Sequence, residues 1–93
     1  MATYILLGKY SREGLKDISA DRTRKVNTLV NELGGKVEAI YAVLGEYDVV
    51  LRVQFPGNNE AMKASVELGK LTGISFNTLP AIPVEEFDKL ITK

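Results

Sequence analysis

The sequence predicts an α+β domain whose strands and helices follow the order β–α–β–β–α–β. Four segments show the β-branched and aromatic residues and the apolar alternation typical of strands. Two segments between them repeat apolar residues at helical spacing. A chain of 93 residues has room for one hydrophobic core, so residues 1–93 are assigned to a single domain.

The first strand and the first helix are expected in the N-terminal third of the chain. Residues 3–10 form a short apolar run with β-branched and aromatic members, which predicts a strand. Residues 11–14 are turn-like, and residues 15–19 fit either a loop or a helical turn. Ser19 or Asp21 can cap the helix that follows, and Gly34-Gly35 ends it because glycine accepts a left-handed backbone. The apolar face of that helix is expected to hold Val26, Leu29, Val30 and Leu33.

Two further strands, residues 36–44 and 47–55, are predicted to form a hairpin. Gly45-Glu46 stands where a tight turn would reverse the chain. Residues 36–44 alternate through Val37, Ala39, Tyr41 and Val43. In the second strand, one face is expected to pack against the helices and holds Tyr47, Val49, Leu51, Val53 and Phe55. The opposite face holds Asp48, Val50, Arg52 and Gln54.

The C-terminal third is expected to hold a second helix, a fourth strand and a short terminal helix. Residues 56–59 end the third strand, and an asparagine among them is expected to cap the helix. The apolar stripe of this helix is expected to hold Ala61, Ala64, Leu68 and Leu71, and Thr72-Gly73 to close it. Residues 74–81 form the fourth strand, where Pro80 favours a sheet edge. Residues 85–91 predict the terminal helix.

This order predicts the ferredoxin-like arrangement, a four-stranded antiparallel sheet with two helices on one face. The other face of the sheet must then meet water, a ligand or a second chain. Its polar and apolar residues alternate in a way that suits a lined cavity between two sheets. A domain of this size buries a modest share of its surface, so we expect two copies to pair as a dimeric α/β barrel, and the chain to be a homo-oligomer.

The composition excludes several classes of function. With 12 Lys and Arg against 12 Asp and Glu, the formal charge is zero, which argues against a nucleic-acid binder held by phosphate contacts. Cys and His are absent, so there is no thiol nucleophile, no disulfide framework and no serine–histidine–aspartate triad. The apolar runs are too short to span a membrane, and the N-terminus has no secretory signal pattern. We therefore expect a cytoplasmic protein with no metal and no cofactor.

The hairpin residues Gly45-Glu46-Tyr47-Asp48 carry a resemblance to a known family. Residues 34–51 around them, the opening residues 4–11, and Glu85-Glu86-Phe87 all resemble the GYD-domain family of small bacterial and archaeal proteins. The likeness covers nearly the whole chain. It implies an architecture rather than a reaction.

Residues 36–55 are also similar to the ligand-binding half of leucine-responsive, or feast/famine, regulators, which carry a comparable Gly-x-Tyr-Asp hairpin. That resemblance implies pairing as dimeric α/β barrels and amino-acid binding at contacts between dimers. In those regulators a separate DNA-reading half comes first. Here the first strand begins at about Thr3, so we expect no direct contact with nucleic acid.

Five residues near the hairpin form the candidate ligand-binding set: Lys9, Tyr10, Tyr47, Asp48 and Arg52. Asp48 either pins the hairpin, lines a pocket that receives a cation, or acts in catalysis. Asp48 and Arg52 lie roughly 13 Å apart along one strand face. At that spacing they can bracket the two ends of a zwitterion, or Arg52 can pair with Glu38 on the neighbouring strand.

Three functions remain open. The leading prediction is binding of an amino-acid-like ligand or a small carboxylate in a pocket between paired sheets. The second is a cofactor-free enzyme of the monooxygenase or isomerase type, for which Asp48 or a tyrosine would have to move the proton because histidine is absent. The third is a structural module that binds another protein. No catalytic residue is assigned.

Overall fold

The structure is a computed structural model that describes residues 1–92, and its elements follow the predicted order with one addition, the short helix α1. The elements are β1 (Ala2–Tyr10), α1 (Arg12–Lys16), α2 (Ala20–Glu32), β2 (Lys36–Ala42), β3 (Val49–Phe55), α3 (Asn58–Thr72), β4 (Ile74–Ala81) and α4 (Val84–Ile91). In place of α1, the sequence predicted a turn at residues 11–14, followed by a loop or a helical turn at residues 15–19. The terminal helix α4 agrees with the predicted helix at residues 85–91.

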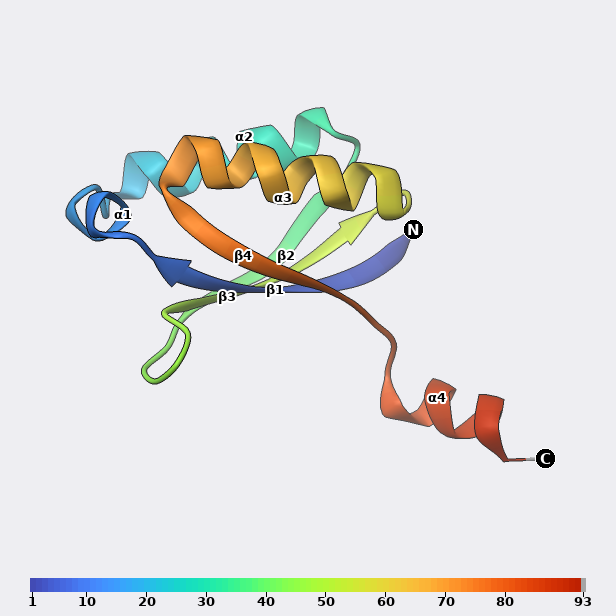
Figure 1. Cartoon of the computed structure of the whole chain (residues 1–93). Helices are drawn as coiled ribbons and strands as arrows, with labels where there is room; N and C mark the ends of the chain where they lie inside the picture. The colour runs from blue at the N-terminus through green and yellow to red at the C-terminus, as the bar shows by residue number, and fades with distance from the viewer. Residues whose placement is uncertain (93) are drawn as a thin grey trace.

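The four strands form one antiparallel sheet in the order β2-β3-β1-β4. The two long helices, α2 and α3, lie side by side over one face of this sheet, and α4 extends away from the body on the other side (Figure 1). The α+β class and the ferredoxin-like order are therefore confirmed. As Pro80 suggested, β4 lies at an edge of the sheet.

The core lies between the sheet and the two long helices. Alternate residues of β1 and β3 point into it, so that Leu6, Val53 and Phe55 are almost wholly buried. The helices contribute Val30 from α2 and Leu68 from α3, which are also fully buried. Each such side chain stabilises the fold by roughly 1.5–3 kcal/mol relative to exposure.

The ends of the long helices are set by a serine and two glycines. The Ser19 side chain accepts a hydrogen bond from the Arg22 N–H at 3.0 Å, so Ser19 and not Asp21 caps α2. Gly34 follows α2 with φ +80°, and Gly73 ends α3 with φ +72°. Both lie in the left-handed region that glycine accepts without strain.

Two expectations about α3 were wrong. Gly57, not an asparagine, occupies the N-cap, and it makes no side-chain cap. Asn58 instead turns toward the sheet, where its Oδ1 accepts a 2.6 Å hydrogen bond from the Tyr4 hydroxyl. At the other end Leu71 is 41% exposed, and Thr72 is buried in its place. The Thr72 hydroxyl donates to the Leu68 carbonyl at 2.7 Å, which satisfies its polar group inside the core.

The alternation predicted for residues 36–44 was also wrong, because β2 contains a bulge between Val37 and Ala39. Val37 pairs with Val53, whereas Ala39 pairs with Arg52 and Tyr41 with Val50. An extra residue in one strand reverses the faces of the residues that follow it. Val37 therefore belongs to the helix side, while Ala39 and Tyr41 lie on the open face.

The hairpin is wider than the expected two-residue turn. β2 ends at Ala42 and β3 begins at Val49, and the Val43 N–H donates to the Asp48 carbonyl at 2.9 Å across the base of the loop. Gly45 sits in the loop with φ +130°, a conformation that side chains disfavour. The loop therefore includes Tyr47 and Asp48, which were expected to belong to the strand.

Candidate functional site

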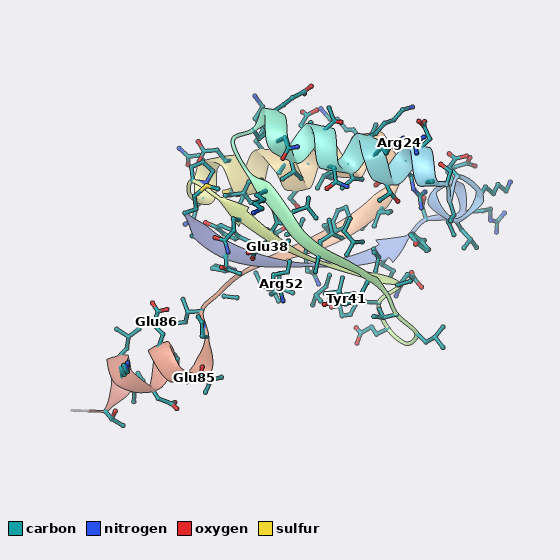
Figure 2. The ribbon with its side chains drawn as sticks, turned by 180° about the vertical axis from the view of Figure 1, so that it is seen from behind. Arg24, Glu38, Tyr41, Arg52, Glu85 and Glu86 are labelled. Carbon is teal, nitrogen blue, oxygen red and sulfur yellow. The ribbon has the colours of Figure 1, made fainter. Side chains whose placement is uncertain are left out.

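The long helices leave the opposite face of the sheet uncovered (Figure 1). Strand alternation and register place five apolar side chains on it: Ile5, Leu7, Tyr41, Val50 and Leu79. Tyr41 is 55% exposed and Leu79 is 46% exposed. Figure 2 shows Tyr41 and Arg52 on this side of the sheet. We call this surface the open face, and its exposed centre is apolar.

A polar cluster crosses the open face between β2, β3 and β1. The Arg52 Nε lies 3.5 Å from the Glu38 Oε1, so the pairing considered from the sequence is present. Gln54 donates from its Nε2 to Glu38 at 3.0 Å and to the Thr3 hydroxyl at 2.6 Å. The Arg52 and Glu38 side chains are 50% and 33% exposed, so solvent screens their attraction in the isolated chain.

Asp48 links the hairpin to the end of β1. Its Oδ2 accepts a 2.9 Å hydrogen bond from the Tyr10 backbone N–H, and its own N–H donates to the Gly8 carbonyl at 2.8 Å. The Asp48 carboxylate thus binds the neighbouring strand rather than its own turn. This contact supports the interpretation that Asp48 holds the hairpin in place. The sequence did not indicate its partner, Tyr10, which lies 38 residues away.

Tyr47 does not face the helices, which corrects the expectation from strand alternation. Its hydroxyl accepts a 3.0 Å hydrogen bond from the Asn77 Nδ2. Asn77, in β4, pairs with Leu7 of β1, and both side chains lie on the open face. The reason is that Tyr47 lies in the loop before β3, where the two-residue alternation of a strand no longer applies.

The structure does not gather the five predicted ligand-binding residues around one point. Lys9 is exposed at the end of β1, on the open face, beside Ser75 in the register. The Tyr10 ring lies on the helix side, where the Arg22 guanidinium carbon is 5.5 Å from the ring centroid. Tyr10 therefore meets Asp48 through its backbone N–H, while its ring is on the opposite side of the sheet from Arg52.

Helix α4 is a second uncovered surface, and none of its residues is buried. Its exposed apolar residues are Val84, Phe87, Leu90 and Ile91. Val84, Phe87 and Ile91 follow the i, i+3, i+7 spacing of one helix face. Glu85 and Glu86 stand on the same detached helix (Figure 2). The spacing can be read from the sequence, but the exposure of every residue of this helix cannot.

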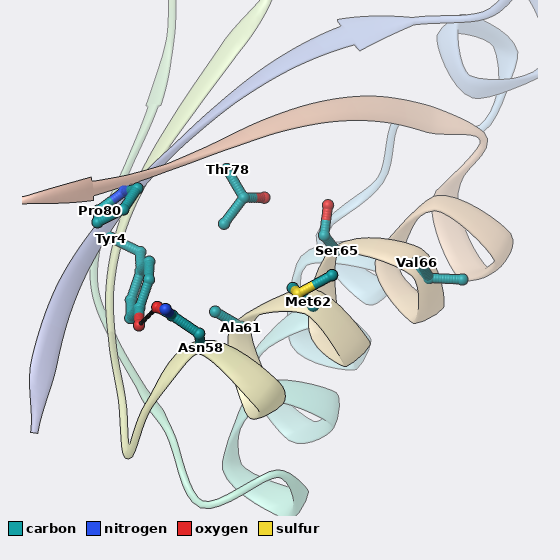
Figure 3. A pocket seen from close by; sticks show the side chains of 8 residues that line it. All are labelled: Tyr4, Asn58, Ala61, Met62, Ser65, Val66, Thr78 and Pro80. Atoms are coloured by element: carbon teal, nitrogen blue, oxygen red, sulfur yellow. Dashed lines mark hydrogen bonds between the residues drawn. The ribbon is translucent and has the colours of Figure 1, made fainter.

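A groove of about 440 Å³ runs between α3 and β4, and no sequence pattern indicated it. The Tyr4–Asn58 hydrogen bond lies at one end of it, as Figure 3 shows. Ser65 and Thr78 also line it, and the Thr78 hydroxyl oxygen is buried without a hydrogen-bond partner among residues 1–92. No charged side chain lines this groove.

Residues 1–92 contain neither a cluster suited to a metal ion nor a helix suited to crossing a membrane. Within this range, no group of three or more Asp or Glu side chains is placed to hold a metal ion. No helix in the same range combines the length and the apolar character that crossing a bilayer requires.

Comparisons with known proteins agree with the resemblances in the sequence. The family model described as "GYD domain" matches residues 4–91. The chain is 33% identical over 89 residues to a protein of Thermus thermophilus named "Glutamine synthetase and cystathionine beta-lyase binding protein". That match covers 92% of this chain and 94% of the relative.

A solved structure shares the fold. It is the crystal structure of the Mycobacterium tuberculosis leucine response regulatory protein, with a TM-score of 0.59 over 88% of this chain. The sequence identity is 10%, so this likeness concerns the fold alone. The chain spans about half of that regulator, 51% of its length.

Proposed function

This chain belongs to the GYD-domain family, and from that premise we propose that it is a binding module that pairs with a second copy and attaches to other proteins. The observation that carries the proposal is the similarity to the Thermus thermophilus protein, whose name describes it as a binder of two enzymes. That similarity extends over nearly the full length of both chains. The proposed binding partners are therefore glutamine synthetase and cystathionine beta-lyase of the same organism.

Two uncovered surfaces support the proposal. The open face offers apolar side chains from all four strands, which suits the face of a second sheet. A stable pair buries about 800 Å² of accessible surface on each partner. The accessible surface of this chain is 6321 Å² in total, so one face of the sheet is a suitable source for that area. Helix α4 has an apolar stripe of the kind that binds in a hydrophobic groove of another protein.

The pairing of copies is tested by measuring molar mass with light scattering after size exclusion. The wild type is expected to elute as a dimer at micromolar concentration. Leu79→Glu places a charge on the open face at a position already 46% exposed, and is expected to give a monomer. Val66→Glu, at a 58% exposed position on α3, is the matched control and should leave the dimer unchanged. A wild-type monomer contradicts the pairing.

Attachment to enzymes is tested by titrating the purified protein with glutamine synthetase and with cystathionine beta-lyase in a calorimeter. Phe87→Glu, on α4, is expected to weaken binding at least tenfold, since it removes a central apolar contact. Val66→Glu again serves as the control. No heat of binding with either enzyme contradicts the proposal, whatever the result for self-pairing.

A small-molecule ligand between the paired sheets is the second candidate, and the polar cluster on the open face favours it. Pairing would bury Arg52 and Glu38, and a buried charge needs a partner for each of its hydrogen-bonding groups. An amino acid, with both charges, fits that need. A thermal-shift series with amino acids should raise the melting temperature of wild type and not of the Arg52→Gln variant.

A further inference from the structure

A small cavity lies on the helix side of the sheet, beneath the first turns of α2. Its volume is about 220 Å³. Its apolar walls come from α2, the sheet and the core: Val26, Ile40, Val49, Leu51, Ile74 and Phe76. The sheet separates this cavity from the open face, so it is not the pocket proposed between paired copies.

Arg22 brings one positive charge to this otherwise apolar space. Its Nη1 donates to the Gly14 carbonyl and its guanidinium lies over the Tyr10 ring. The hydroxyl-bearing residues Ser19 and Thr23 also line the cavity, but no Asp or Glu does. The cavity is therefore mainly apolar, with hydroxyl groups from Ser19 and Thr23 and one positive charge from Arg22.

The partners of Arg22 set it apart from the two cations that follow it on α2. Arg24 and Lys25 both pair with Asp21, at 3.3 Å and 3.4 Å. Within residues 1–92, no carboxylate lies within ion-pair distance of Arg22. A guanidinium has five N–H donors, and among residues 1–92 Arg22 donates one hydrogen bond, to the Gly14 carbonyl. The remaining N–H donors of Arg22 are therefore available to bind an anionic ligand.

Three other hollows among residues 1–92 differ in their lining. One of them, beside the first turn of α2, also borders Arg22, but it includes Asp17 and Asp21. The groove between α3 and β4 has no charged lining. The hollow between α2 and α3 is lined by two lysines and two glutamates, Lys25, Glu32, Glu67 and Lys70, whose charges cancel. Of these four, the cavity beneath α2 is the one that joins a mainly apolar lining to a cation with no carboxylate in the same lining.

We propose that this cavity binds a small monocarboxylate with an apolar or aromatic body. The body would lie against Val49 and Phe76, and the carboxylate would accept charge-assisted hydrogen bonds from Arg22. The size is suitable, because an apolar protein cavity of about 150 Å³ accommodates benzene. A volume of 220 Å³ leaves room for a ring and a carboxylate. The site is independent of self-pairing and of enzyme binding.

The test uses benzoate and phenylacetate as probes, with benzamide as the uncharged control of the same shape. Titration of the full-length protein, followed through its backbone amide NMR signals, is expected to shift Arg22, Val49 and Phe76 with the carboxylates. Benzamide should bind at least about tenfold more weakly, since it lacks the charge-assisted bonds. Equal affinity for benzamide, or shifts confined to the open face, overturns the proposal.

Two variants localise the site. Arg22→Gln should weaken benzoate binding at least about tenfold, while Arg24→Gln makes the same charge change two residues along α2 and should leave it unaltered. Ala42→Phe adds a ring from β2, where Ala42 lines the cavity, leaves Arg22 in the sequence and should abolish binding. If Arg22→Gln fails to fold, the Ala42→Phe and benzamide results still decide. Unchanged binding in Ala42→Phe, or equal loss in Arg24→Gln, overturns the proposal.

Discussion

The Asp48 carboxylate accepts a 2.9 Å hydrogen bond from the Tyr10 backbone N–H and so ties the start of β3 to the end of β1. The Asp48 N–H donates to the Gly8 carbonyl at 2.8 Å in the same place. The aspartate that marks the family's hairpin is therefore part of the sheet's own hydrogen bonding. A ligand that used this oxygen would have to compete with a backbone donor.

Asp48→Ala is expected to destabilise the protein by about 1–3 kcal/mol, because the part-buried Tyr10 N–H loses its acceptor. Asp48→Asn keeps an oxygen in place and should lose less. Urea unfolding measures both. Equal stability of Asp48→Ala and wild type would show that the contact contributes nothing.

Gly8→Ala is expected to cost about 1–3 kcal/mol through overpacking. A Cβ at this position would lie 2.6 Å from the Val49 Cγ1 and 2.8 Å from the Phe76 Cε1. Gly69→Ala, inside α3, is the control, since its Cβ would approach nothing nearer than 3.4 Å. That change should stabilise the helix by about 0.5–1 kcal/mol. Thermal melts of the two variants should shift in opposite directions.

The Glu38–Arg52 pair should contribute about 0.2–1 kcal/mol in the separated chain, as exposed ion pairs do. A double-mutant cycle with Glu38→Gln and Arg52→Gln at low protein concentration measures this coupling. Repeating the cycle at a concentration where copies pair should give a larger value, since pairing removes water from the two side chains. The same coupling at both concentrations argues against pairing through the open face.

Phe87→Ser combined with Leu90→Ser should change the free energy of unfolding by less than about 0.5 kcal/mol, as surface substitutions do. The reason is that no residue of α4 is buried against the body. Denaturant unfolding of the dilute protein checks the value. A loss of several kcal/mol would mean that α4 packs on the core in solution.

Local patterns in the sequence predicted most of the fold. Ser19 begins α2, and the glycines at 34 and 73 follow the last turns of α2 and α3, as expected. Each acts through its own backbone neighbours. The strand alternation of β3 from Val49 to Phe55 is also as predicted. These features depend on residues a few positions apart, so a single sequence suffices to infer them.

The errors arose where a distant residue decides the local geometry. Asn58 was expected to cap α3, but it accepts a hydrogen bond from Tyr4, 54 residues away. The bulge after Val37 lets the Glu38 side chain reach Gln54 and Arg52 on β3. The partner of Asp48 is likewise on another strand. The spacing of residues along the sequence does not predict contacts between such distant residues.

Both outer strands of the sheet carry an interruption, and this limits how copies can assemble. β2 has its bulge between Val37 and Ala39, and β4 has Pro80, which supplies no N–H to a further strand. Neither edge offers an unbroken row of backbone groups for a neighbouring sheet to extend. Growth edge to edge into a continuous fibre is thereby disfavoured.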